Sequence, residues 1–90
     1  MTLDSARTIA RIRHPGVDFD TAWRLATTTD RSYLVTCAAE ADRNAQDFCE
    51  RAHAEDGGDA LTRRALWEDS KNEATRADTL RAAIDFIDMA

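Results

Sequence analysis

The sequence is poor in residues that form turns and in residues that cross membranes. Its 90 residues include only three glycines and one proline, which is too few to punctuate a fold of many short strands. Lysine is almost absent, because Lys71 is the sole lysine and the other eleven basic residues are arginines. No apolar run approaches the roughly 18–20 residues that span a bilayer. These absences argue against a many-stranded fold and against a membrane-spanning segment.

The residues that are abundant favour helix. Alanine, leucine, arginine, glutamate and aspartate dominate the composition, and most of them have high helix propensity. Ninety residues are enough for one domain with a thin core. We therefore predict a single helical domain over residues 1–90, with an all-α fold: a compact bundle of four to five helices around a long central helix at about 31–55.

The central helix is predicted from one apolar stripe whose members recur at alternating steps of four and three. Its start is ambiguous, because residues 33–37 are rich in strand formers. We favour helix there, since the stripe continues without a break, and we place the end near Glu55, before Gly57-Gly58. The stripe is mostly small and lets a neighbouring helix approach closely. Its members are Leu34, Ala38, Ala41, Ala45, Phe48 and Ala52.

A first helix is predicted over residues 3–13, where apolar residues share one face. The segment His14-Pro15-Gly16 stops it, because the residue before proline avoids the helical region and glycine turns freely. Arg7 and Arg11 lie one turn apart on its outer side. They form either an ordinary solvated face or, as a second interpretation, a basic binding arm.

A second, short helix is predicted over roughly 19–27, opened by Asp18 or Asp20. Trp23 shares a face with Phe19, and we expect Trp23 to lie in the core because tryptophan is highly buried on average. The threonines that follow disfavour helix and end it.

The next helix is predicted from Ala60 to about Glu68, with Asp59 as its cap. Trp67 falls at the edge of its apolar face. The side chains expected to face inward are Leu61, Ala65 and Leu66.

Residues 68–73 contain no apolar side chain. They form either an exposed turn of one long helix or a break between two helices. We predict a kink or short break, because Ser70 and Glu73 have the spacing of a capping box. The last helix then runs to about Asp88.

The motifs that could carry chemistry are weak. Glu50 and His53 form a single Glu-x-x-His, whereas a di-iron site needs a second such pair. Cys49 and His53 lie one turn apart, but zinc needs two further ligands, which nothing nearby supplies. Cys37 lies about 18 Å from Cys49 along one helix, too far for a disulfide. We therefore predict a protein that is not an enzyme, with free thiols and with no cofactor or metal.

The net charge of −5 is unevenly placed. Residues 1–35 have a balance of +1, and the residues from 36 onward have a balance of −6. An acidic body argues against nucleic acid or an anionic membrane as the main partner, and favours a protein partner with a basic surface. Because no signal peptide is recognisable, we expect a cytoplasmic protein.

Acidic residues end two of the predicted helices, where the helix dipole makes each of them unfavourable by roughly 0.3–1 kcal/mol. A local rule broken without local benefit points to function, although solvated, fraying ends would show the same pattern. The candidate partner-binding residues are these four acids and two from the outer face of the central helix: Asp47, Glu50, Glu55, Asp56, Asp85 and Asp88.

Together these features predict a non-enzymatic interaction protein that occludes a basic, nucleic-acid-binding surface of its partner. In size, acidity and lack of a site motif, the chain resembles small phage-encoded inhibitors, including anti-CRISPR proteins, and no specific residues carry this resemblance. Two alternatives stay open. One is a helical homodimer, structural or regulatory, with the alanine-rich stripe as its seam. The other is a DNA-binding regulator that uses Arg7, Arg11, Arg13 and Arg24.

Overall fold

The computed structural model describes residues 2–54 and 59–89, and all regular structure within them is helical. The predicted all-α fold with a long central helix is confirmed. The helices are α1 (Leu3–Arg13), α2 (Phe19–Thr28), α3 (Arg31–Ala54) and α4 (Ala60–Met89).

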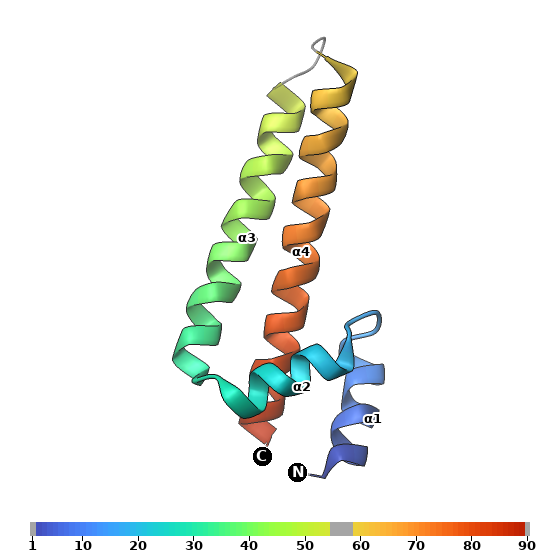
Figure 1. The fold of residues 1–90 in the computed structure, drawn as a ribbon, viewed down its shortest axis with the longest axis vertical. Coiled ribbons are helices and arrows are strands. Elements are labelled where there is room, and N and C mark those ends of the chain that lie inside the picture. The colour runs from blue at the N-terminus through green and yellow to red at the C-terminus, as the bar shows by residue number, and fades with distance from the viewer. Residues whose placement is uncertain (1, 55–58, 90) are drawn as a thin grey trace.

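Helices α3 and α4 form a long antiparallel hairpin, and α1 and α2 pack at one end of it (Figure 1). The molecule measures 51 × 24 × 16 Å, so the hairpin sets its length. We call the end that holds α1 and α2 the base, and the opposite end, where α3 ends and α4 begins, the distal end. Neither long helix carries, in its described residues, an apolar stretch that could cross a membrane.

The core lies at the base and consists of two clusters. One fills the seam between α3 and α4, around Leu34, which is only 1% exposed. The other joins α1 and α2 to α4 around Phe86, whose ring centroid lies 5.6 Å from that of Phe19 and 5.8 Å from that of Trp23. Trp23 is half-buried at the margin of this second cluster and therefore packs on α4 as part of the core.

The apolar stripe of α3 is packed by a neighbouring helix, as predicted, and that helix is α4. Leu34, Ala38, Ala41 and Ala52 are buried. Residues 33–37 are helical, which settles the ambiguity at the start of α3. Buried Cys37 and half-buried Cys49 are both free thiols, as their spacing predicted.

The predicted break at 68–73 is wrong, because α4 is continuous from Ala60 to Met89. Ser70 does not cap a helix. Its hydroxyl donates a hydrogen bond of 2.8 Å to the carbonyl oxygen of Ala45 on α3. A helix in a two-helix seam needs about one seam residue per turn, and Ser70 fills that position with a polar contact.

The predicted inward positions of Leu61 and Ala65 are also wrong. Leu66 is buried, but Leu61 is 75% exposed and Ala65 is exposed as well. Counting back from Leu66 in steps of three or four along the seam reaches Arg63, which is half-buried. Leu61 is five residues from Leu66, so it lies about 140° away around the helix, on a different face.

Local capping signals explain where the helices begin. The Oγ1 of Thr2 accepts a hydrogen bond from the amide of Ser5 at 3.2 Å, and Oδ1 of Asp59 accepts one from the amide of Leu61 at 3.1 Å. Gly16, between α1 and α2, has a φ of 86°, a conformation that glycine adopts without steric cost.

The seam predicts a sharp difference between two alanines of α3. Ala41 is fully buried against α4, whereas Ala39 is exposed on the same helix. We expect Ala41→Leu to lower the free energy of unfolding by about 1–3 kcal/mol, because the added volume must force the helices apart. Ala39→Leu, the matched control, should change it by less than about 0.5 kcal/mol. Urea unfolding measures both, and equal midpoints for the two variants would contradict the seam packing.

Candidate functional site

The two acids at the C-terminal end of α4 are both paired with basic side chains of the same chain. Asp88 accepts two hydrogen bonds from the guanidinium of Arg31, Nε to Oδ1 at 2.6 Å and Nη2 to Oδ2 at 3.0 Å. Nε2 of His14 donates to Oδ2 of Asp85 at 2.6 Å, and Nη1 of Arg13 lies 3.9 Å from the same oxygen. The positive charges of Arg13 and Arg31, together with the hydrogen bond from His14, therefore offset the unfavourable interaction of these acids with the helix dipole.

The Arg31–Asp88 pair joins the last turn of α4 to the first turn of α3. The hydrogen bond and the positive charge of Arg31 lower the pKa of Asp88, and the same hydrogen bond raises the pKa of Arg31. Asp85 and Asp88, predicted as partner contacts because they break a helix rule, thus have contacts within the fold that account for their position.

Two of the remaining predicted acids, Asp47 and Glu50, lie toward the distal end. Asp47 and Glu50 are exposed on the last turns of α3. Oδ2 of Asp47 is 3.9 Å from Nη1 of Arg51, and Oε1 of Glu50 accepts a hydrogen bond of 3.1 Å from the amide of Gln46. Glu55 and Asp56 fall outside the described residues.

Negative charge is concentrated in this part of the chain. Residues 47–59 hold five acidic residues and one arginine, a balance of −4, so the rest of the molecule has a balance of only −1. The described acids of this segment are Asp47, Glu50 and Asp59, which we call the acidic tip. They stand at the end of the hairpin farthest from α1 and α2 (Figure 1).

Two large apolar side chains are exposed at the same end. Trp67 is 43% exposed, and its ring contacts the ring of His53 edge-on, with the centroids 5.1 Å apart. Leu61, on the first turn of α4, is 75% exposed. The exposure of Leu61 was not predicted, although its spacing of five residues from Leu66 places it on a different face of the helix.

The distal end also contains Cys49 and His53, which lie one helical turn apart and could supply two of the four ligands of a zinc site. His53 is exposed, Cys49 is half-buried, and His53 packs on Trp67. Within residues 2–54 and 59–89, no group of three or more histidine, cysteine, aspartate or glutamate side chains is placed to hold a metal ion. The distal end therefore offers charge and apolar surface for binding.

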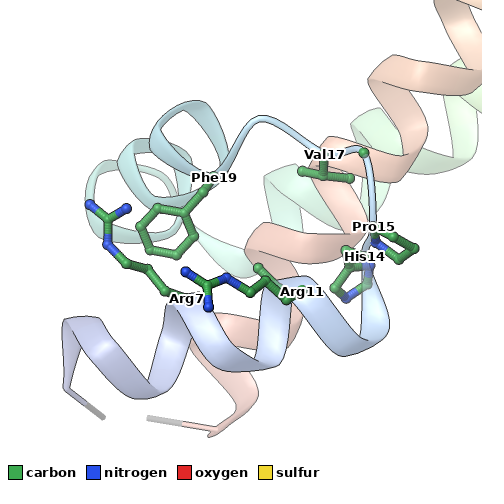
Figure 2. A pocket seen from close by; sticks show the side chains of 8 residues that line it. Arg7, Arg11, His14, Pro15, Val17 and Phe19 are labelled. Atoms are coloured by element: carbon green, nitrogen blue, oxygen red, sulfur yellow. The ribbon is translucent and has the colours of Figure 1, made fainter.

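The base contains two hollows. One, of about 350 Å³, is lined by Arg7 and Arg11 of α1 and by Phe19 at the start of α2 (Figure 2). The other, of about 330 Å³, lies among α2, α3 and α4 and is lined in part by Tyr33 and Cys37. A hydrogen bond to the Cys37 thiol raises the pKa of Tyr33.

The Arg31–Asp88 pair predicts a pH-dependent loss of stability. Because the folded-state pKa of Asp88 is lowered, its stabilising contribution is present above the ordinary aspartate value of about 4 and is lost as pH falls through the lower folded value. We expect the melting temperature of Asp88→Asn to lie below that of the wild type at pH 7. Near pH 2 the two melting temperatures should be nearly equal. The control Asp69→Asn alters an exposed acid of α4 and should have little effect at either pH. If the melting temperature of Asp88→Asn lies below that of the wild type by the same amount at pH 7 and at pH 2, the ionised carboxylate of Asp88 does not stabilise the fold and the prediction is wrong.

No protein-family model, curated protein or solved structure matches this chain. The function must therefore be argued from the two features that the fold sets at opposite ends of the molecule. These are the acidic tip, with its exposed Trp67 and Leu61, and the arginine-lined hollow at the base.

Proposed function

We propose that the protein is a non-enzymatic binding module whose distal end docks on a basic surface of a partner protein. The observation that carries this proposal is the concentration of charge: residues 47–59 account for −4 of the net −5. At the base, Asp85 is hydrogen-bonded to His14 and Asp88 is paired with Arg31. Along the chain, negative charge is thus densest between the last turns of α3 and the start of α4, and Arg63 and Arg64 follow on the first turns of α4.

The exposed apolar side chains support a protein as the partner. Charge alone attracts counterions and steers encounters, but a stable interface also buries a few large anchors. Trp67 and Leu61 are exposed at the end that carries the acidic tip, and tryptophan is among the residues most enriched at interface hot spots.

The shape of the molecule suits occlusion. A two-helix hairpin can enter a groove that the broader base cannot follow, and an acidic end matches a groove lined for nucleic acid. The mechanism we propose is steric exclusion of nucleic acid from that groove, helped by charge complementarity. In size and acidity the chain resembles small phage-encoded inhibitors, such as anti-CRISPR proteins.

The homodimer alternative now requires a different surface. The alanine-rich stripe of α3 packs against α4 of the same chain, so it is not exposed for a second copy. The DNA-binding alternative has a smaller patch than its four arginines suggested, because Arg13 lies toward Asp85 while Arg7 and Arg11 line the hollow of α1.

Charge reversal tests the acidic tip. We expect the double variant Asp47→Lys with Glu50→Lys to lose at least about tenfold in affinity, or about 1.4 kcal/mol, for a partner captured by the wild-type chain and then purified. Affinity of the wild type should fall as salt is raised. Titration calorimetry at two salt concentrations measures both effects.

The matched control is the double variant Glu40→Lys with Asp78→Lys. Glu40 is exposed on α3 and Asp78 is exposed on α4, both near the level of the core. It changes the net charge by the same amount and should retain binding. Equal loss in the two double variants would show a general charge effect and contradict a docking site at the distal end. Failure of the wild type to displace nucleic acid from its partner would contradict the occlusion mechanism.

A further inference from the structure

A hollow lies at the base, between α1 and the start of α2. It has a volume of about 350 Å³, within the range of small-molecule sites. Arg7 and Arg11 extend from α1 on the side of Phe19, and His14 and Pro15 stand at the other end of the hollow (Figure 2). Ala10 and Val17 supply apolar lining between the two ends.

Arg7 is held in place by an aromatic ring. Its guanidinium carbon lies 4.8 Å from the centroid of the Phe19 ring, a distance typical of a cation–π contact. Phe19 is itself held, because its ring stacks on Trp23 with the centroids 5.9 Å apart and contacts Phe86 of the core. A guanidinium stacked by its face keeps its N–H groups free to donate in its own plane, so Arg7 is pre-organised to bind an anion.

Arg11 lies one helical turn from Arg7 and lines the same hollow. Within the described residues, neither guanidinium has a carboxylate within 4.0 Å, whereas Arg13, Arg31 and Arg81 all do. Two like charges at this spacing repel each other. This repulsion is about 0.2–0.5 kcal/mol, and an anion bound between the two guanidinium groups would remove it.

The two ends of the hollow differ in charge. Nε2 of His14 is already hydrogen-bonded to Asp85, so at that end the ring nitrogen is committed and a carboxylate is near. An anion is therefore favoured at the Arg7–Arg11 end, with any attached carbon skeleton lying along Ala10, Val17 and Pro15.

We propose that this hollow binds the phosphate group of a small phosphate monoester. A phosphate dianion matches the paired donors of two guanidinium groups. A small ligand is favoured over an extended polyanion, because a nucleic acid would need a continuous basic surface, and the molecule as a whole has a charge of −5. This site is separate from the acidic tip, and each proposal can fail without the other.

Ribose 5-phosphate is the probe that tests the site, and ribose is its uncharged control. The chain has two tryptophans, so a Trp67→Phe background leaves Trp23, stacked on Phe19, as the sole fluorescent reporter. We expect ribose 5-phosphate to change the Trp23 emission with saturation and ribose to have no effect. Absence of a saturable change up to about 10 mM, together with no heat of binding by calorimetry, would overturn the proposal.

Variants at exposed arginines separate this site from general charge effects. In that background we expect Arg7→Gln and Arg11→Gln each to weaken binding at least about tenfold, as expected for loss of a charge-assisted bidentate contact. Arg24→Gln, on exposed α2 surface outside the lining, should leave it unchanged. Circular dichroism confirms that each variant remains folded.

Three other outcomes would overturn the proposal. Equal weakening by Arg24→Gln would show nonspecific attraction. Binding of inorganic phosphate as tight as that of ribose 5-phosphate would show a site for the free anion rather than for a monoester. Binding of a duplex DNA oligonucleotide that is stronger than that of ribose 5-phosphate and sensitive to Arg24→Gln would show a nucleic-acid surface.

Discussion

The structure depends on how closely α3 and α4 approach along their shared seam. The seam is built mainly from alanines, with Ala38 and Ala41 on α3 facing Ala77 and Ala83 on α4. Each small side chain makes few contacts, so the seam is stable only when the two backbones stay near each other over many turns. This constraint accounts for the long continuous α4 and for the length of the molecule, since a bend would separate the alanines and leave a cavity.

The same constraint divides the molecule into two ends with different properties. At the base, α1 and α2 add an aromatic cluster around Phe86, while His14 contacts Asp85 and Arg31 of α3 pairs with Asp88. Toward the distal end there are only two helices, and each buries one stripe and exposes the rest. The described acids of the acidic tip, with Trp67 and Leu61, therefore lie away from the two core clusters, whereas the other large exposed apolar side chains lie at the base: Leu3, Ile12, Tyr33 and Val35. This separation lets a binding surface vary without disturbing the packing that holds the fold.

Much of the fold could be predicted because its signals are local. A proline–glycine stop ends α1, a run of threonines ends α2, and one apolar stripe marks α3. The continuity of α4 could not be predicted, because the contact that fills its polar stretch runs from Ser70 to a backbone carbonyl on another helix. Of the candidate site, Asp47 and Glu50 were identified as exposed acids from charge and spacing. The hollow beside Arg7 and Arg11 was not, because its wall is Phe19, contributed by the next helix.

The sequence by itself determined the helices and the concentration of negative charge near the end of α3, because propensity, capping and charge are properties of neighbouring residues. Only the tertiary structure decided which charges remain uncompensated. Asp88 contacts Arg31, which is 57 residues away in the sequence, and Asp85 contacts His14, which is 71 residues away. No local sequence pattern predicts contacts at such separations. The packing of the helices thus brought Asp85 and Asp88 against His14 and Arg31 at one end of the molecule and placed two arginines over one hollow. At the other end, Asp47 and Glu50 stay exposed and contact residues of their own helix.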